Sequence, residues 1–109
     1  MSKIKYDVLL PKSKAQFEGL LQNIFKSNPK HIVVRVLADY LSLEDLLMVL
    51  DKYAHQIENF KKNKSIIIWT SDFDYELIPD FVPVVPTEAE AVDVIDFEEI
   101  ERDLLLEEE

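Results

Sequence analysis

The sequence predicts an α/β sandwich with a four-stranded, mostly parallel sheet and about three main helices. Short β-branched apolar runs alternate along the chain with longer segments in which apolar residues recur every three or four positions. Alternation of strands and helices requires crossover connections, which place successive strands in parallel. The length of 109 residues leaves room for one hydrophobic core. Residues 1–109 are therefore expected to form one domain, with residues 97–109 as an acidic C-terminal helical extension.

Two strands are predicted before residue 40. Residues 3–10 alternate, with apolar side chains at Ile4, Tyr6, Val8 and Leu10, which predicts a strand with one well-buried face. Residues 31–37, HIVVRVL, are apolar on both faces. A strand of that kind belongs in the middle of a sheet that is covered on both sides.

A helix is predicted between these strands, over residues 13–27. Ser13 and Gln16 have the spacing of a capping box, and apolar residues follow at helical spacing. The pair Asn28-Pro29 is expected to end this helix. Gly19, the single glycine, costs roughly 1 kcal/mol relative to alanine inside a helix. We expect it to permit a close approach of the helix to the sheet.

The strongest helix prediction covers residues 42–61. Ser42 is the expected N-cap, acidic residues follow it, and a wide apolar face runs through the segment. Lysines at 61, 62 and 64 suit a helix end, where cations meet the negative end of the dipole. Residues 64–70, KSIIIWT, predict another buried strand. The predicted shared core consists of Val33, Val34, Val36, Leu46, Leu47, Leu50, Ile66, Ile67 and Ile68.

The remaining segments are an acidic irregular stretch, a short strand and a last helix. Residues 71–81 are expected to hold one helical turn around Tyr75 to Ile78. Residues 82–85 predict a strand, which Pro83 assigns to a sheet edge or a strand start. Thr87 and Glu90 have capping-box spacing and open the last helix.

The apolar face of this last helix rotates near Asp96. The two faces consist of Ala91, Val92 and Ile95 in the first half and of Phe97, Ile100 and Leu104 in the second. Two explanations stay open: a kink near Asp96, or a second half that leaves its own domain and packs on a partner. Exposed apolar stripes of the second kind mark interfaces. The acidic residues around the stripe favour a basic surface such as Lys61, Lys62 and Lys64, either of the same domain or of a second subunit, which leaves a homodimer open.

Composition and charge exclude several classes of function. Residues 1–70 hold 11 Lys and Arg against 7 Asp and Glu, whereas residues 71–109 hold 1 against 15. The net charge of −10 argues against nucleic-acid binding, because phosphate backbones repel such a chain. The sequence has no cysteine, no apolar run of membrane-spanning length and no apolar region of a signal peptide. We therefore expect a cytoplasmic protein that binds neither nucleic acid nor membrane.

Few residues point to catalysis. Asp72 and Asp74 follow a strand, as the paired aspartates of haloacid-dehalogenase-type phosphatases do, but the lysine and second acidic pair of such enzymes have no counterpart downstream. His31 and His55 are isolated, and each is more simply a packed or surface histidine. We expect no metal and no cofactor. The alternative retained is a small hydrolase, a phosphatase or nuclease, that uses Asp72 and Asp74.

The order of elements around Ser42 resembles the STAS-type domain of anti-sigma-factor antagonists. A central strand, a helix that begins with a serine, the strand IIIWT, a short strand and a final helix follow one another in that order. In that family the strand–helix junction carries an Asp-Ser-Ser-Gly-like motif, whose serine is phosphorylated to switch partner binding. The junction here reads ADYLSL, in which Ser42 and Asp39 match and the glycine is missing. The resemblance implies a non-catalytic regulatory module with a protein partner.

A second resemblance lies in the C-terminal segment VVPTEAEAVDVIDFEEIERDLL. It is similar to the end of short uncharacterised Bacteroidetes proteins that read PTLQEALDIIEMEEIERDL. Some of those chains carry the name ribonuclease Z, an enzyme that requires a His-x-His-x-Asp-His zinc motif. The two isolated histidines of this sequence cannot supply that motif.

Overall fold

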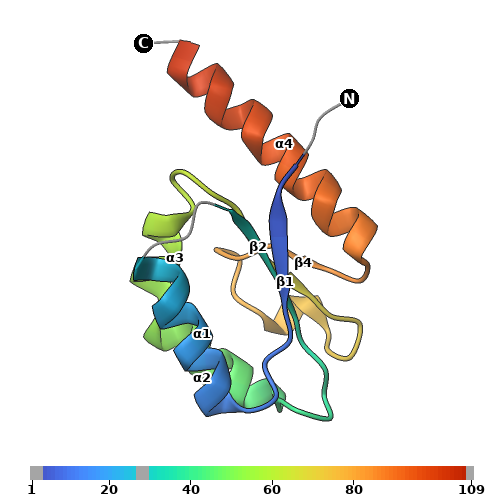
Figure 1. Ribbon diagram of the computed structural model, residues 1–109. Coiled ribbons are helices and arrows are strands. Elements are labelled where there is room, and N and C mark those ends of the chain that lie inside the picture. Colours follow the sequence, from blue (N-terminus) through green and yellow to red (C-terminus); the bar gives the residue numbers. More distant parts are fainter. Residues whose placement is uncertain (1–3, 27–29, 108–109) are drawn as a thin grey trace.

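The computed structural model describes residues 4–26 and 30–107, with side chains described as far as Leu105. Its described strands form one four-stranded sheet in the order β1-β2-β3-β4, and every described pairing is parallel (Figure 1). The predicted α/β sandwich is confirmed. The elements are β1 (Tyr6–Leu9), α1 (Lys14–Lys26), β2 (His31–Arg35), α2 (Leu43–Lys52), α3 (Ala54–Phe60), β3 (Ile66–Trp69), η1 (Tyr75–Leu77), β4 (Val84–Val85) and α4 (Glu88–Glu107).

The strands pair so that β-branched apolar side chains lie opposite one another on each face of the sheet. Val8 lies opposite Val33, which lies opposite Ile67. On the other face Val34 lies opposite Ile68, which lies opposite Val84. β2 and β3 are the inner strands, as their continuous apolar sequences predict.

The prediction of a well-buried face for residues 3–10 is wrong. Val8 is 42% exposed and Leu10 36% exposed, although both belong to the alternating apolar set. β1 lies at the edge of the sheet, and α4 makes its main contacts with β3 and β4. The carboxyl end of β1 therefore stays open on the α4 side.

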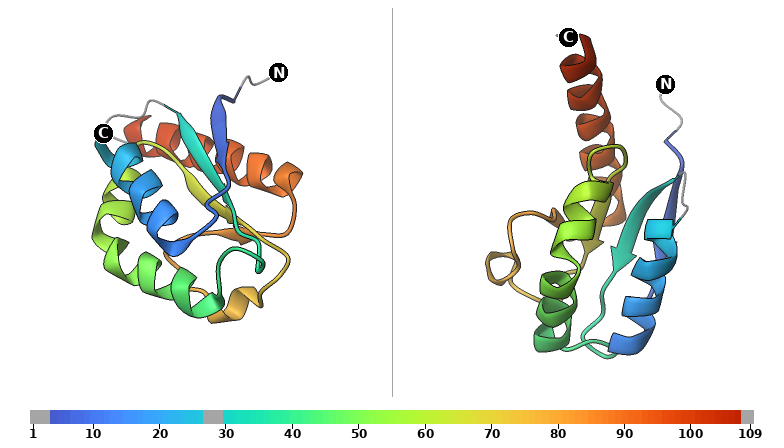
Figure 2. Two further views of the ribbon diagram at one scale, coloured as in Figure 1. Left: turned by 60° about the horizontal axis from the view of Figure 1, so that its bottom comes forward. Right: turned by 90° about the vertical axis from the view of Figure 1, so that its left-hand side faces the viewer.

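The two faces of the sheet are covered unequally. α1, α2, α3 and the connection between β3 and β4 pack on one face, and α4 packs on the other (Figures 1 and 2). The predicted core is consequently divided, because Val33 and Ile67 pack with α4 while the other buried members face α1 to α3. Leu47 is only partly buried, whereas Val49, on the opposite flank of the buried face of α2, is fully buried.

The helix predicted over residues 42–61 is two helices, α2 and α3, which meet at Tyr53. The backbone of Tyr53 leaves helical geometry, with φ −106° and ψ 15°. Its side chain is anchored from α1, because its hydroxyl accepts a hydrogen bond from Gln22 at 2.7 Å and donates one to Glu18 at 3.2 Å. These contacts tie the break to α1, and the described residues hold four α-helices rather than about three.

The predicted caps are present, but the role expected for Gly19 is wrong. Ser13 Oγ accepts from the backbone N–H of Gln16 at 3.0 Å, and Thr87 Oγ1 accepts from that of Glu90 at 3.2 Å. Gly19 lies exposed on α1, and a Cβ built there would meet nothing within 4 Å. It therefore permits no close approach to the sheet. The expected helix end at Asn28-Pro29 lies outside the described residues.

α4 is one continuous helix of 20 residues, without the interruption considered near Asp96. Its first half lies over β3 and β4, where Ala91 and Ile95 are fully buried. Its second half extends past the sheet and rises clear of the other helices (Figure 2). The rotation of the apolar pattern therefore reflects a change in what the helix faces rather than a bend.

Candidate functional site

The second half of α4 carries two contrasting faces. Ile95, Glu98 and Arg102 follow one another at spacings of three and four, and this face points toward the sheet. Phe97, Ile100 and Leu104 also follow such spacings, on the opposite side of the helix. The inner face thus becomes polar where the outer face becomes apolar.

His31 joins the inner face of α4 to the start of β2. The imidazole is 3% exposed, and its Nε2 lies 2.7 Å from Glu99 Oε2. The backbone N–H of Ser65 donates to His31 Nδ1 at 2.9 Å. Because Nδ1 acts as an acceptor, the ring proton lies on Nε2 and is donated to Glu99. His31 is therefore a hydrogen-bonded structural histidine of the domain core.

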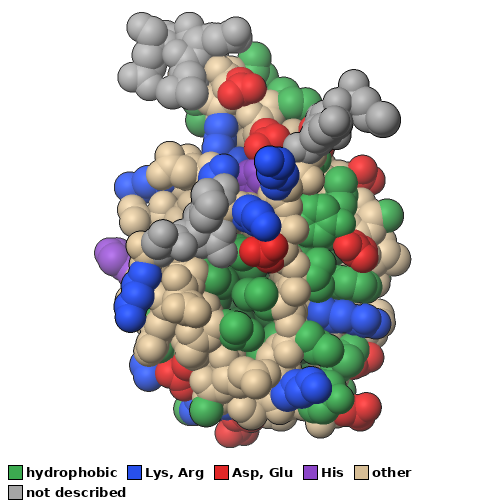
Figure 3. All heavy atoms as spheres, in the orientation of Figure 1, with side chains coloured by type: hydrophobic (Ala, Val, Ile, Leu, Met, Phe, Trp, Pro, Cys, Tyr) green, Lys and Arg blue, Asp and Glu red, His purple; other side chains and the backbone are tan. Residues whose placement is uncertain are grey.

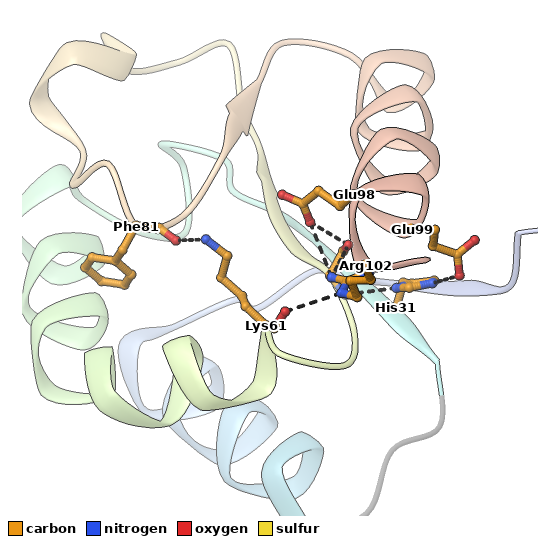
Figure 4. Close-up of polar contacts among 7 residues, drawn as sticks. His31, Lys61, Phe81, Glu98, Glu99 and Arg102 are labelled. Atoms are coloured by element: carbon orange, nitrogen blue, oxygen red, sulfur yellow. Dashed lines mark hydrogen bonds and ion pairs between the residues drawn. The ribbon is translucent and has the colours of Figure 1, made fainter. Parts of the chain in front are cut away.

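Arg102 makes the second connection, to the start of β3 (Figure 4). Its Nη2 donates to Ser65 Oγ at 2.9 Å and its Nε to the carbonyl of Lys61 at 3.4 Å. Ser65 Oγ in turn donates to Glu98 Oε1 at 2.6 Å, and Glu98 lies 3.6 Å from Arg102. Together with His31 and Glu99, these residues form what we term the α4 anchor: His31, Ser65, Glu98, Glu99 and Arg102.

The α4 anchor holds the apolar residues of the second half outward. We term this outer set the α4 stripe: Phe97, Ile100 and Leu104. These side chains are 61%, 52% and 55% exposed, respectively. Carboxylates border the stripe at Asp96, Glu101 and Asp103. The stripe is thus an apolar, acid-rimmed surface on a helix whose opposite side is fastened to its own domain.

The structure places Ser42 and Asp39 at the carboxyl ends of the strands, far along the sheet from the α4 anchor. Ser42 is exposed, and its Oγ accepts from the backbone N–H of Asp45 at 3.1 Å, as an N-cap does. Asp39 is exposed in the turn that precedes it. This junction and the α4 stripe are therefore separate surfaces.

Asp72 and Asp74 lie near this junction and serve the backbone. Asp72 Oδ2 accepts from the N–H of Ala38 at 2.7 Å, which ties the loop after β3 to the loop after β2. Asp74 Oδ1 accepts from the N–H of Glu76 at 2.9 Å and caps η1. Both carboxylates thus stabilise local backbone structure through hydrogen bonds. His55 is exposed on α3 and does not join them.

In two side-chain pairs elsewhere, a hydrogen bond shifts the pKa of at least one member. Tyr6 donates its hydroxyl to Glu88 Oε2 at 2.7 Å, and this hydrogen bond raises the pKa of the tyrosine. Lys52 donates to Glu18 at 2.8 Å, which lowers the pKa of that carboxyl. Both pairs join elements that are distant in sequence. They fasten the first turn of α4 to β1 and α2 to α1.

The α4 anchor was not predicted from the sequence, although one signal for it is present. Ala91, Ile95, Glu98 and Arg102 continue a single helical face without interruption. Following that face past Ile95 indicates that the inward side turns polar. The partners of Glu98, Glu99 and Arg102 are His31, the first residue of β2, and Ser65, which directly precedes β3. The apolar sequences of these two strands do not indicate such contacts.

Comparisons with models of protein families, with curated proteins and with solved structures found no match to this chain. Among the described residues, no helix combines the length and apolar character required to cross a bilayer. Nor do residues 4–26 and 30–107 bring together three or more His, Cys, Asp or Glu side chains that could hold a metal ion.

Proposed function

We propose that this chain is a non-catalytic protein-interaction module and that the α4 stripe is its binding surface. The observation that carries the proposal is the contrast between the two sides of one helix. The inner side is fastened by partly buried hydrogen bonds of His31 and Arg102, while three large apolar side chains, Phe97, Ile100 and Leu104, face outward. Apolar surface that is held outward by specific contacts, and rimmed by polar residues, is typical of a protein interface.

The charge around the stripe defines the partner's chemistry. Residues 71–109 hold 15 acidic residues and 1 basic residue, and Glu101 and Asp103 border the stripe directly. Such a rim favours an apolar protein surface flanked by Lys and Arg, and it repels acidic ones. Because exposed charge pairs are screened by salt, the association should weaken as ionic strength rises.

The resemblance to anti-sigma-factor antagonists supports a regulatory role for the second surface, the Ser42 junction. Ser42 is exposed at the start of α2, and Asp39 lies in the turn before it. A phosphate on Ser42 would be stabilised by the helix N-terminus and would add negative charge to that edge. The alternative is a hydrolase that uses Asp72 and Asp74. In such an enzyme both carboxylates would have to act in catalysis while they accept hydrogen bonds from backbone N–H groups.

Site-specific crosslinking tests the stripe. A photoreactive residue replaces Ile100 in one variant and Met48, an equally exposed apolar residue of α2, in a control. We expect position 100 to crosslink a peptide that carries apolar residues beside Lys or Arg, and position 48 not to. The crosslink should be lost in the pair Phe97→Ser and Leu104→Ser. Equal crosslinking at both positions, or none at position 100, would contradict the proposal.

A further inference from the structure

One side of the sheet is only partly covered by its own helix. Four strands spaced about 4.8 Å apart span more than one helix of about 10 Å diameter can cover. α4 packs mainly on β3 and β4. The β1 side of that face is therefore left open near the carboxyl ends of the strands.

The open region is apolar and contains the basic side chain of Arg35. Val8 is exposed there and lies beside Val33 in the sheet register. Leu10, the residue that follows β1, is exposed as well. Arg35 follows Val33 on that side, and its guanidinium lies 4.4 Å from the ring centroid of Trp69, which is half-buried. We term Val8, Leu10, Arg35 and Trp69 the open sheet face. Figure 3, in which β1 lies toward the viewer, shows hydrophobic side chains along this side of the molecule, with side chains of both charges among them.

The chain thus carries two surfaces that complement each other. The α4 stripe is apolar with carboxylates at its rim, and the open sheet face is apolar with Arg35 at its centre. The stripe cannot reach the open face of its own sheet, because the α4 anchor turns it away from that sheet. Only another molecule can bring the two together.

We infer that the partner of the α4 stripe is the open sheet face of a second copy of this chain. The contact is reciprocal, so that two α4 helices lie side by side between two sheets, and each sheet is covered by two helices. The inference rests on the proposed function, since it assigns an occupant to the same surface. The reciprocal contact also enlarges the buried area, because each copy contributes both its α4 stripe and its open sheet face. One stripe alone offers only a few hundred Å², whereas a stable interface needs about 800 Å² from each partner.

A dimer built from two stripes alone is disfavoured by charge. Glu101 and Asp103 of both copies would then face each other across the seam, and like charges in contact oppose association. When the α4 stripe of one copy packs on the open sheet face of the other, those carboxylates instead approach Arg35. The two arrangements predict different effects of changes in the open sheet face, and this difference defines the experiment.

Sedimentation equilibrium of the full chain, up to about 1 mM protein, provides the test. We expect a dimer for the parent and monomers for two variants: a stripe variant, Ile100→Ser with Leu104→Ser, and a face variant, Val8→Thr with Arg35→Glu. An equimolar mixture of the two variants should form heterodimers, because one intact stripe then meets one intact face. Thermal unfolding of each variant and the substitution Met48→Ser serve as controls for folding and for generic loss of apolar surface.

Three outcomes would overturn the inference. A monomeric parent shows that the chain does not pair with itself. A face variant that still forms dimers shows stripe-to-stripe packing. A mixture of variants that stays monomeric shows that stripe and face do not meet. In each case crosslinking from position 100 to another protein would leave the proposed function intact, whereas the absence of any crosslink would remove that as well.

Discussion

His31 Nε2 and Glu99 Oε2 lie 2.7 Å apart although 68 positions separate them in the sequence. This contact joins the first residue of β2 to the second half of α4, beyond the last buried apolar residue of that helix. It explains how a helix can extend past its sheet and still hold a fixed orientation. The direction of the α4 stripe therefore depends on a buried imidazole.

Replacing His31 by Phe should destabilise the domain by about 1–3 kcal/mol. The ring volume is kept, but the buried N–H of Ser65 loses its acceptor and Glu99 loses its donor. Urea unfolding measures the loss, and hydrogen exchange should accelerate in residues 97–105 of α4. The control is Glu99→Gln, in which an oxygen acceptor remains, so the loss should be smaller. Unchanged stability and exchange in His31→Phe would show that the α4 anchor does not hold the helix.

Gly19→Ala should stabilise the protein by about 0.5–1 kcal/mol. Alanine restricts the unfolded chain and favours the helix, and its Cβ meets open space on α1. Gly19→Ser provides a graded comparison and should gain less, because serine is a weaker helix former. The free energy of unfolding checks both. A destabilised Gly19→Ala protein would indicate a contact at this position that the described residues do not show.

Leu50→Ala should cost about 2–5 kcal/mol, whereas Leu47→Ala should cost clearly less. Leu50 is fully buried in the cluster beneath α2, and Leu47 packs only at its margin. Both changes remove the same atoms from the same helix, so the difference reports burial alone. Equal losses measured by denaturant unfolding would mean that α2 buries Leu47 as fully as Leu50.

Features of this molecule that depend on residues close together in the sequence could be predicted from it, whereas features that depend on distant residues could not. Ser42 as a cap and Ile67 as a buried strand residue were predicted, because capping and strand patterning depend on near neighbours in sequence. The exposure of Val8 was not, since it depends on which strand lies at the edge and on where α4 crosses. The contacts of Tyr53, where α2 and α3 meet, are likewise made to a different helix, α1.

The candidate surfaces divide in the same way. The α4 stripe was predicted from spacing within one helix, and its residues are exposed. Whether a partner covers them is a property of two molecules. The α4 anchor combines His31 and Ser65 with residues of α4, and no local pattern indicates that these strand starts meet that helix. Pairings across the fold thus decide what the local patterns leave open.

The Tyr6–Glu88 hydrogen bond predicts a loss of stability at high pH. The bond raises the pKa of Tyr6 in the folded protein above its ordinary value of about 10. Its stabilising contribution is complete below the unfolded value, and it is lost as the pH rises through the folded one. Tyr6→Phe should therefore flatten the dependence of unfolding free energy on pH above about 10. An identical pH dependence in both proteins would contradict this assignment.

Substitutions at Ser42 should separate its capping role from a phosphorylation switch. Ser42→Ala should cost about 0.5–2 kcal/mol, because the N–H of Asp45 loses its acceptor, whereas Ser42→Asp should cost little since aspartate also caps. If the junction is regulatory, Ser42→Asp alters binding of the crosslinked partner severalfold, and Ser42→Thr does not. Self-association should respond to neither, because Ser42 begins α2, which covers the face of the sheet opposite to the open sheet face. Unfolding curves and titration with the partner measure the two effects independently. Unchanged affinity in Ser42→Asp, together with a destabilised Ser42→Ala, would make this serine a helix cap and nothing more.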